Sequence, residues 1–325
     1  MPKGFLTHLA PLSMVSFVER DYRILASRFR MRKWAYRGRL RGIQDRAAIY
    51  LGVRRSDFNV SWFAYNQAFW AVRHSKNLGR KSLVVIGGFD VSEEEDPRLQ
   101  HRLPTLRYVL RHADCLLALS EHLQTKVLAL EPTARVELLY PGFDATRYAP
   151  AGSKAPIVTT ISFVRHANLQ RKGLETFVRA AANLPALEFL LIGEWLDDSI
   201  RYLRGIAPPN VSFAGWLPEP DLIRALQQSA VYVQASLHEG FGCSLAEAML
   251  CGCVPVVSAR GAIPEVVGDV GIYVDPASPE DLARGIRGAF DEPERGYSAR
   301  ERVARLFPLG RRGSLLISKV EELLA

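Results

Sequence analysis

The sequence predicts an α/β protein built from two Rossmann-like domains, each with a parallel β-sheet. Its 325 residues are enough for two domains of roughly 100–200 residues each. Short apolar runs rich in β-branched residues alternate with amphipathic stretches along nearly the whole chain, which is the pattern of βαβ units. These runs form two series, and a segment rich in proline and glycine separates them.

Each apolar run is read as one buried strand. In the first series we expect strands at residues 5–8, 28–36, 60–64, 82–86, 115–119 and 136–140. In the second series we expect strands at residues 157–163, 188–192, 211–213, 231–234, 254–257 and 271–274. The amphipathic stretches between them predict the connecting helices.

Residues 140–156 form the expected hinge between the two series. Three prolines and two glycines in this segment cannot continue a helix or a central strand. We therefore expect one domain over residues 1–150 and a second over residues 151–310. Residues 311–325 predict a last helix with an apolar stripe, and packing back across the hinge is one way to bury that stripe.

The composition is that of a globular protein, but its charge is uneven. The chain is 48% hydrophobic and 23% charged, which excludes a disordered or fibrous protein. The formal net charge is +8, from 42 Lys and Arg against 34 Asp and Glu. Residues 1–80 hold 16 of those cations and 4 of those acids, so the remaining residues hold 26 and 30. The basic character therefore belongs to the first quarter of the chain.

The sequence predicts a cytoplasmic protein, with peripheral attachment to the cytoplasmic face of a membrane as a further option. No run of about 18 apolar residues is present, and the first residues do not resemble a secretory signal. The four cysteines fit a chain without disulfides. Cys251 and Cys253 lack the spacing of a zinc site and are expected to be small buried apolar residues.

The strongest signal for chemistry lies at residues 237–250. After the strand expected at 231–234, the chain enters a loop with two glycines, and a helix is expected from about residue 243. Such a turn lets the backbone approach a ligand, and a helix start offers N–H groups to a phosphate-sized anion. Glu239 in the loop and Glu247 in the helix add carboxylates that accept hydrogen bonds from sugar or ribose hydroxyls. Similar turns occur in proteins that bind nothing, but a buried Glu247 requires a partner.

A second signal is the basic loop that follows the strand expected at 157–163. Arg165, Arg171 and Lys172 stand after its carboxyl end, where parallel sheets bind ligands. Two or three cations there would neutralise a diphosphate. A solvated surface loop is the alternative, and it becomes less attractive if this loop faces the one that contains Glu239.

These residues resemble the donor site of retaining, family-four glycosyltransferases with the GT-B fold. The run HEGFGCSLAEAMLCGCVPVVS at 238–258, with its two glutamates, and GAIPEVVG at 261–268 look like the signature of that family. Arg165 and Lys172 match its Arg and Lys-Gly pair, and the likeness extends over most of residues 80–310. The resemblance implies two Rossmann-like domains whose parallel sheets face each other across a cleft.

The resemblance also implies a role for each matching residue. Glu247 would hold the nucleotide ribose, while Arg165 and Lys172 would hold the diphosphate. Glu239 would meet the donor sugar, together with the backbone of Gly240, Phe241, Gly242, Cys243 and Ser244. A third segment would lie beside the nucleobase, namely Gly215, Trp216 and Leu217, although Trp216 could equally serve packing. Such enzymes use no metal and no further cofactor, because fixed cations and helix amides stabilise the leaving diphosphate.

The N-terminal half departs from the family pattern. The first turn reads LAPLSM at 9–14 instead of a Gly-Gly turn, and the strand expected at 82–86 leads to Gly87, Gly88 and Asp90. Asp90 is a candidate for binding a sugar hydroxyl, and capping a turn is the alternative. His8 is a weaker candidate and is read as structural. The group that assists proton removal from the acceptor is left open.

The basic first quarter suggests a partner for this half. Residues 28–41 contain seven cations interleaved with Phe29, Trp34 and Tyr36, a composition that suits a nucleic-acid backbone or an anionic membrane. A merely solvated face is the alternative. We favour an anionic membrane reached through residues 20–41, or a lipid-linked acceptor, over nucleic acid.

The residues and the resemblance together predict a retaining, metal-independent hexosyltransferase of glycan biosynthesis. It would move a sugar from a nucleotide diphosphate sugar to an acceptor hydroxyl of a glycan or of a lipid-linked or membrane-surface glycan. Two alternatives stay open: a sugar-nucleotide epimerase of the same fold, and a non-catalytic scaffold that binds membrane or nucleic acid. A nicotinamide oxidoreductase is disfavoured because no Gly-x-Gly-x-x-Gly follows an expected strand.

Overall fold

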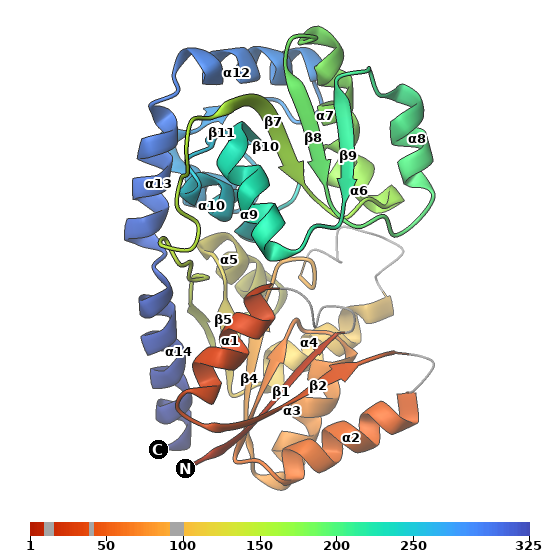
Figure 1. Cartoon of the computed structure of the whole chain (residues 1–325). Helices are drawn as coiled ribbons and strands as arrows, with labels where there is room; N and C mark the ends of the chain where they lie inside the picture. The colour runs from red at the N-terminus through yellow and green to blue at the C-terminus, as the bar shows by residue number, and fades with distance from the viewer. Residues whose placement is uncertain (10–15, 39–41, 92–100) are drawn as a thin grey trace. The chain divides into compact units, whose positions relative to one another are not determined.

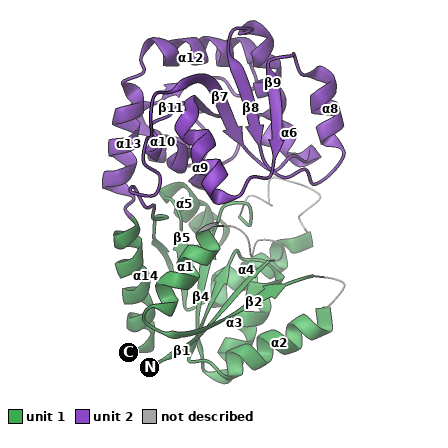
Figure 2. Cartoon of the chain, viewed as in Figure 1, with its two compact units in different colours: residues 1–142, 309–325 green, residues 143–308 purple. Residues whose placement is uncertain are grey.

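The computed structural model describes residues 1–9, 16–38, 42–91 and 101–325 (Figure 1). These residues form two compact units, which Figure 2 shows in green and purple. Unit 1 comprises Met1–Gly142 and Leu309–Ala325, and unit 2 comprises Phe143–Pro308. Each unit has one six-stranded sheet in which all pairings are parallel. Both expected Rossmann-like units are thus confirmed, and every expected strand is present with ends shifted by at most a few residues.

Unit 1 has the strand order β2-β1-β3-β4-β5-β6, with helices between successive strands. Its strands are β1 Lys3–Leu9, β2 Arg30–Tyr36, β3 Phe58–Trp62, β4 Lys81–Ile86, β5 Cys115–Ala118 and β6 Val136–Leu138. Its helices are α1 Ser16–Ala26, α2 Gly42–Arg54, α3 Asn66–Leu78, α4 Leu103–His112, α5 Glu121–Leu130 and α14 Leu309–Leu324.

Unit 2 has the strand order β12-β11-β10-β7-β8-β9. Its strands are β7 Ala155–Ile161, β8 Glu188–Ile192, β9 Val211–Gly215, β10 Ser229–Gln234, β11 Val254–Val257 and β12 Ile272–Tyr273. Its helices are α6 His166–Arg171, α7 Leu174–Ala180, α8 Ser199–Ile206, α9 Glu219–Gln228, α10 Cys243–Leu250, α11 Ile263–Val267, α12 Pro279–Asp291 and α13 Arg295–Leu306. Short 3-10 turns cover Ala181–Asn183 and Gly268–Val270.

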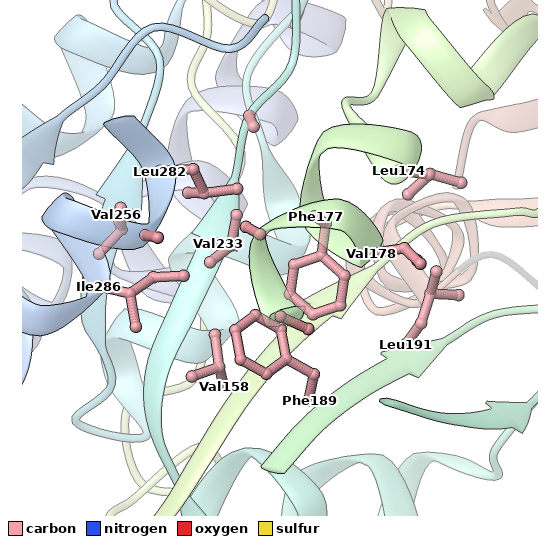
Figure 3. Close-up of a cluster of buried hydrophobic side chains, with 14 of the residues drawn as sticks. Val158, Leu174, Phe177, Val178, Phe189, Leu191, Val233, Val256, Leu282 and Ile286 are labelled. Atoms are coloured by element: carbon pink, nitrogen blue, oxygen red, sulfur yellow. The ribbon is translucent and has the colours of Figure 1, made fainter. Parts of the chain in front are cut away.

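The core of unit 2 explains why its strands read as apolar runs. Helices cover both faces of a parallel sheet, so both faces of its central strands are buried. Figure 3 shows one face, where Phe189 of β8 and Val233 of β10 point toward Phe177 of α7 and Ile286 of α12. The ring centroids of Phe177 and Phe189 lie 5.2 Å apart. This packing holds the strand ends, and therefore the loops that leave them, in fixed positions.

The C-terminal helix α14 belongs to unit 1, although the rest of that unit ends at Gly142. Its Arg312 is buried and makes two hydrogen bonds to the Asp21 carboxylate of α1, at 2.7 and 2.6 Å. The same guanidinium donates to the backbone oxygens of Leu139 and Tyr140. Removing either charge would leave the other buried and unpaired, at a cost of about 3–5 kcal/mol. This ion pair is therefore the main polar anchor of α14.

Candidate functional site

The best-defined site lies in unit 2, at the carboxyl ends of β7 and β10. These strands pair with each other, and the later strands continue from them in opposite directions, β8 and β9 on one side and β11 and β12 on the other. Ligands of open parallel sheets bind outside the strand ends at such a point, where the strand order reverses. The segment after β7, expected to be a loop, contains the short helix α6, with Arg165 directly before it and Lys172 directly after it, and the loop after β10 carries Glu239.

The structure brings Lys172 and Glu239 into direct contact. Lys172 Nζ lies 2.5 Å from Glu239 Oε2, and the two side chains are only 18% and 13% exposed. The backbones of the two loops are also joined, since Leu237 N–H donates to the Arg171 carbonyl at 2.9 Å. Gly173 has φ +65°, and a Cβ there would lie 2.2 Å from the Ala235 carbonyl oxygen. Glycine at position 173 therefore permits the close approach of the two loops.

The electrostatics of this contact keep Glu239 ionised. Burial by itself would raise the pKa of Glu239, but the charge and hydrogen bond of Lys172, with a further contribution from Arg171, lower it below its ordinary value. Gln234 Nε2 donates a second hydrogen bond to the same Oε2 atom at 2.9 Å. The site therefore presents a carboxylate and an ammonium side by side, one suited to hydroxyls and the other to anions.

Polar residues of β10 form a hydrogen-bond chain that ends at Glu239 and was not visible in the sequence. The Tyr232 hydroxyl donates to Gln234 Oε1 at 3.1 Å and lies 2.9 Å from Ser244 Oγ. Gln234 Nε2 bonds to both Glu239 and Ser236. Burial, followed by the charges of Glu239 and Glu247, raises the pKa of Tyr232, so its hydroxyl keeps its proton. The missed signal was a polar residue at every second position of a buried strand.

Helix α10 starts at this site, as expected, and carries Glu247 and Ser244. Gly242 precedes it with φ +93° and has no side chain to cap the first amides. Glu247 is buried, whereas Cys243 and Ser244 are half-buried at the first turn. A helix start of this kind favours an anion through its amides and its dipole.

Arg165 and Arg171 converge on one buried residue, Asn168. Its Oδ1 accepts from Arg171 Nη2 at 2.7 Å and from Arg165 Nε at 3.4 Å. Its Nδ2 donates to the Phe163 carbonyl at 2.7 Å, which fixes the orientation of the amide. Asn168 lies in α6 and thus positions two guanidinium groups just before Lys172, a role that was not visible in the sequence.

Trp216 is exposed, so packing in the core is not its role. Its side chain is 54% exposed, and it follows Gly215, the last residue of β9, while Leu217 is half-buried. Two further aromatic side chains, Phe163 after β7 and Trp195 after β8, are also exposed. Because β7, β8 and β9 are neighbours, these three rings belong to the same end of the sheet. Flat apolar rings at that end could stack on a nucleobase.

The ring of Phe241 is buried, which leaves its backbone for the contact expected of this segment. Its side chain is buried between Phe143, at a ring distance of 5.9 Å, and Phe307, at 5.1 Å. Phe143 N–H also donates to the Phe307 carbonyl at 2.9 Å. Phe143 and Phe307 lie where the chain enters and leaves unit 2. Only the backbone of Phe241 remains a candidate for ligand contact, while its ring anchors the loop with Gly240.

In unit 1, the surroundings of Asp90 match turn capping, the alternative considered for it. Its carboxylate is 1% exposed and accepts from the backbone amides of Ala64 at 2.9 Å and Gly88 at 2.8 Å. Burial raises the pKa of Asp90 despite these hydrogen bonds. In this arrangement the side chain joins the loops after β3 and β4, which favours the turn-capping alternative over a contact with a sugar hydroxyl.

The remaining N-terminal candidates are also accounted for by local structure. His8 is buried at the end of β1, its Nδ1 lies 3.0 Å from the Leu9 carbonyl oxygen, and burial lowers its pKa. Residues 10–14 of the unusual first turn lie outside the described residues. Within the basic segment, several cations already have partners: Arg23 and Lys33 pair with Glu19, and Arg28 pairs with Glu321. Residues 39–41 of that segment lie outside the described residues as well.

Among the residues that the structure describes, no three or more His, Cys, Asp or Glu side chains are grouped so as to hold a metal ion. No described helix combines the length and the apolar character needed to cross a bilayer.

The family match with known proteins falls within unit 2, the half that contains this site. Residues 157–292 match the family model described as glycosyl transferases group 1. The O-antigen chain mannosyltransferase B of Escherichia coli is 38% identical over 94 residues, 28% of this chain and 25% of that protein. The lipopolysaccharide core biosynthesis glycosyltransferase LpsE of Rhizobium meliloti is 28% identical over 230 residues, 67% of this chain and 63% of that protein. The chain thus spans only part of the length of either relative.

Solved structures extend the likeness to both units. The crystal structure of Anabaena Alr3699/HepE in complex with UDP and glucose superimposes with a TM-score of 0.84, over 99% of this chain and 100% of that one, at 17% identity. At that identity the likeness concerns the fold. The chain therefore has the two-domain GT-B fold, and residues 157–292 within unit 2 match the group 1 glycosyl transferases.

Proposed function

We propose that the protein is a retaining, metal-independent glycosyltransferase of family four that uses a nucleoside diphosphate sugar as its donor. The acceptor would be a hydroxyl of a glycan or of a lipid-linked glycan, bound by unit 1. The contact between Lys172 and Glu239 carries the proposal, because it places an anion-binding and a hydroxyl-binding group 2.5 Å apart at the strand ends where ligands bind. The family match over residues 157–292 and the UDP and glucose bound to the Anabaena neighbour support the same assignment.

Each part of the donor has a counterpart in unit 2. The ribose would be held by Glu247, and the diphosphate by Lys172, Arg165 and the first amides of α10. The sugar would meet Glu239 and the backbone of residues 240–244. The base would lie beside residues 215–217, with Trp216 as a stacking surface. Apart from Glu247, which lies one turn inside α10, these residues are in loops or at helix ends that follow β7, β9 and β10 of the same sheet.

The cations of the site would promote sugar transfer by stabilising the departing diphosphate. In glycosyl transfer, the bond between the sugar C1 and the diphosphate oxygen breaks, a bond from C1 to the acceptor oxygen forms, and the acceptor hydroxyl releases its proton. Negative charge builds up on the departing diphosphate, where fixed cations and helix amides stabilise it without reorganisation. Lys172 is well placed because Glu239 holds its ammonium in position before the donor arrives.

Donor binding and stereochemistry test this proposal. Thermal unfolding would be followed with UDP, GDP and ADP sugars, since a ligand at 100 times its dissociation constant stabilises by roughly 2.7 kcal/mol. The stabilising donor would then be incubated with short alkyl glycosides, and the anomeric configuration of the product read by NMR. We expect one nucleotide class to stabilise and the anomer to be retained. An inverted product contradicts the retaining assignment, and an isomerised nucleotide sugar without acceptor would indicate an epimerase.

A further inference from the structure

Helix α2 of unit 1 exposes an apolar row that nothing in the described structure covers. Ile43, Ala47 and Leu51 are spaced four residues apart and so lie along one side of the helix. All three are exposed, and Ile43 is the most exposed of them, at 83%. Tyr50 is exposed beside this row, with its ring centroid 5.3 Å from that of His74. An exposed apolar row of this kind indicates an interaction surface.

The opposite side of α2 already provides the contacts that hold the helix in the fold. Asp45, Ile49 and Val53 are buried there, and the last two join a core cluster with Phe5 and Ala71. Figure 1 shows α2, in orange, beside α3, with which it packs. The exposed row is therefore not needed to attach α2 to unit 1, and its exposure is not explained by folding.

The charges around the row have one sign. Residues 42–55 contain the cations Arg46, Arg54 and Arg55, all exposed, and a single acid, Asp45. Asp45 is buried and accepts hydrogen bonds from Trp34 Nε1 at 3.1 Å and from the Arg37 amide at 2.9 Å. The surface that α2 presents is therefore apolar along its centre and basic at its sides.

Strand β2 extends the basic character of this region. It is an edge strand, and the bond from Trp34 to Asp45 places one face of β2 beside α2. Arg30 and Arg32 share that face with Trp34, because side chains of a strand alternate, and all three are exposed. An amphipathic aromatic ring beside cations is typical of positions at a membrane interface.

We propose that this face of α2, with the row Ile43, Ala47 and Leu51 at its centre, docks unit 1 on an anionic phospholipid bilayer. An apolar helix face that is flanked by arginines lies in the plane of the interface, with its apolar side chains among the acyl chains and its cations at the headgroups. Self-association through the same face is disfavoured, since a symmetric dimer would bring like cations together. The inference goes beyond the proposed donor chemistry and does not depend on it.

The position of this surface also refines the expectation from the sequence. The segment 20–41 was expected to contact a membrane, yet Arg20, Arg23, Arg28 and Lys33 have partners within unit 1. The surface proposed here instead combines Arg30 and Arg32 with α2, which follows that segment in the chain. It supplies apolar side chains, which a basic segment alone does not.

Vesicle flotation of the full chain tests the proposal. The wild-type protein is expected to float with vesicles of phosphatidylcholine and phosphatidylglycerol and to bind vesicles of phosphatidylcholine alone much more weakly. The double variant Ile43→Ser/Leu51→Ser should bind the anionic vesicles at least about tenfold more weakly. Arg54→Glu/Arg55→Glu should lower binding by about fivefold or more for each cation, and the loss should shrink at high salt.

A control uses apolar residues of the same unit that are exposed to the same degree as Leu51. Leu128 of α5 and Leu315 of α14 serve this purpose, and Leu128→Ser/Leu315→Ser should bind vesicles like the wild type. Unchanged thermal unfolding and nucleotide binding of every variant would show that the fold and the donor site are intact. The proposal is overturned if the wild type binds neither kind of vesicle, if Ile43→Ser/Leu51→Ser binds like the wild type, or if the same face instead mediates a dimer or oligonucleotide binding.

Discussion

Glu239 in unit 2 and Asp90 in unit 1 are both largely buried carboxylates in loops at the strand ends of a parallel sheet, but their surroundings differ. Glu239 faces the ammonium of Lys172, which lowers its pKa against the effect of burial. Asp90 accepts hydrogen bonds from neutral backbone amides, and burial raises its pKa. A carboxylate beside a lysine ammonium has a charged partner that a bound ligand can share. A carboxylate enclosed by amides holds two loops together instead.

The largest expected effect concerns the enclosed carboxylate. Asp90→Ala leaves the amides of Ala64 and Gly88 buried without their acceptor. We therefore expect the free energy of unfolding to fall by about 3 kcal/mol. Urea denaturation measures this loss. Nucleoside diphosphate affinity, measured by calorimetry on the folded variant, should not change, and a large loss of affinity would mean that Asp90 contributes to the donor site.

Removing the cation of the other pair should abolish most of the donor affinity. Lys172→Ala deletes a charge-assisted hydrogen bond worth about 1.5–3 kcal/mol, so the affinity for the nucleoside diphosphate should fall by about 10- to 100-fold. Arg201→Ala is the matched control, since Arg201 is an exposed cation on α8 of the same unit. If both variants bind alike by calorimetry, Lys172 does not hold the diphosphate.

Neutralising Glu239 should separate binding from transfer. In Glu239→Gln, Lys172 loses its carboxylate partner. A diphosphate then no longer has to compete with that carboxylate for the ammonium. We expect nucleoside diphosphate affinity to hold or rise while sugar transfer falls by about tenfold, because the amide is a weaker partner for sugar hydroxyls. Calorimetry and a coupled transfer assay measure the two quantities. A parallel loss in both would indicate that Glu239 acts only as a support for Lys172.

The smallest effect is a difference in pH dependence. The lowered pKa of Glu239 gives stability that is present above the unfolded value of about 4.3 and is lost as pH falls through the folded value. The raised pKa of Asp90 acts oppositely, since stability falls as pH rises from about 3.9 through its folded value. As pH falls below about 4.3, Glu239→Gln should lose less stability than the wild type, and as pH rises above about 3.9, Asp90→Asn should gain stability relative to the wild type. Thermal midpoints of the three proteins would show this, and identical slopes would refute the opposite shifts.

The fold could be predicted from the sequence because its signals are local. A strand buried on both faces requires a continuous apolar run, and each expected run became a strand of one of the two sheets. The start of α10 after Gly242 was visible for a similar reason, because a positive φ at the helix cap favours glycine. The strand ends were less certain, since hydrogen bonding between neighbouring strands sets them.

The supporting residues of the site were not visible in the same way. Tyr232, Gln234 and Asn168 matter because of side chains that come from other parts of the chain. The residue type alone does not show whether a buried polar group meets such a partner. The same holds for Asp90, for which the sequence left sugar binding and turn capping open. Its hydrogen bonds to the amides of neighbouring loops are visible only in the structure.

By itself, the sequence determined two sheets, the segment between them, and the loops that carry Arg165, Lys172, Glu239 and Glu247. These features depend on hydrophobic periodicity and on turn residues, which act within a few positions of the chain. Only the tertiary structure decided that Lys172 meets Glu239, that α14 returns to unit 1, and that the basic first quarter is joined by an apolar face of α2. Each of these depends on which distant segments become neighbours, and strand order and packing determine that.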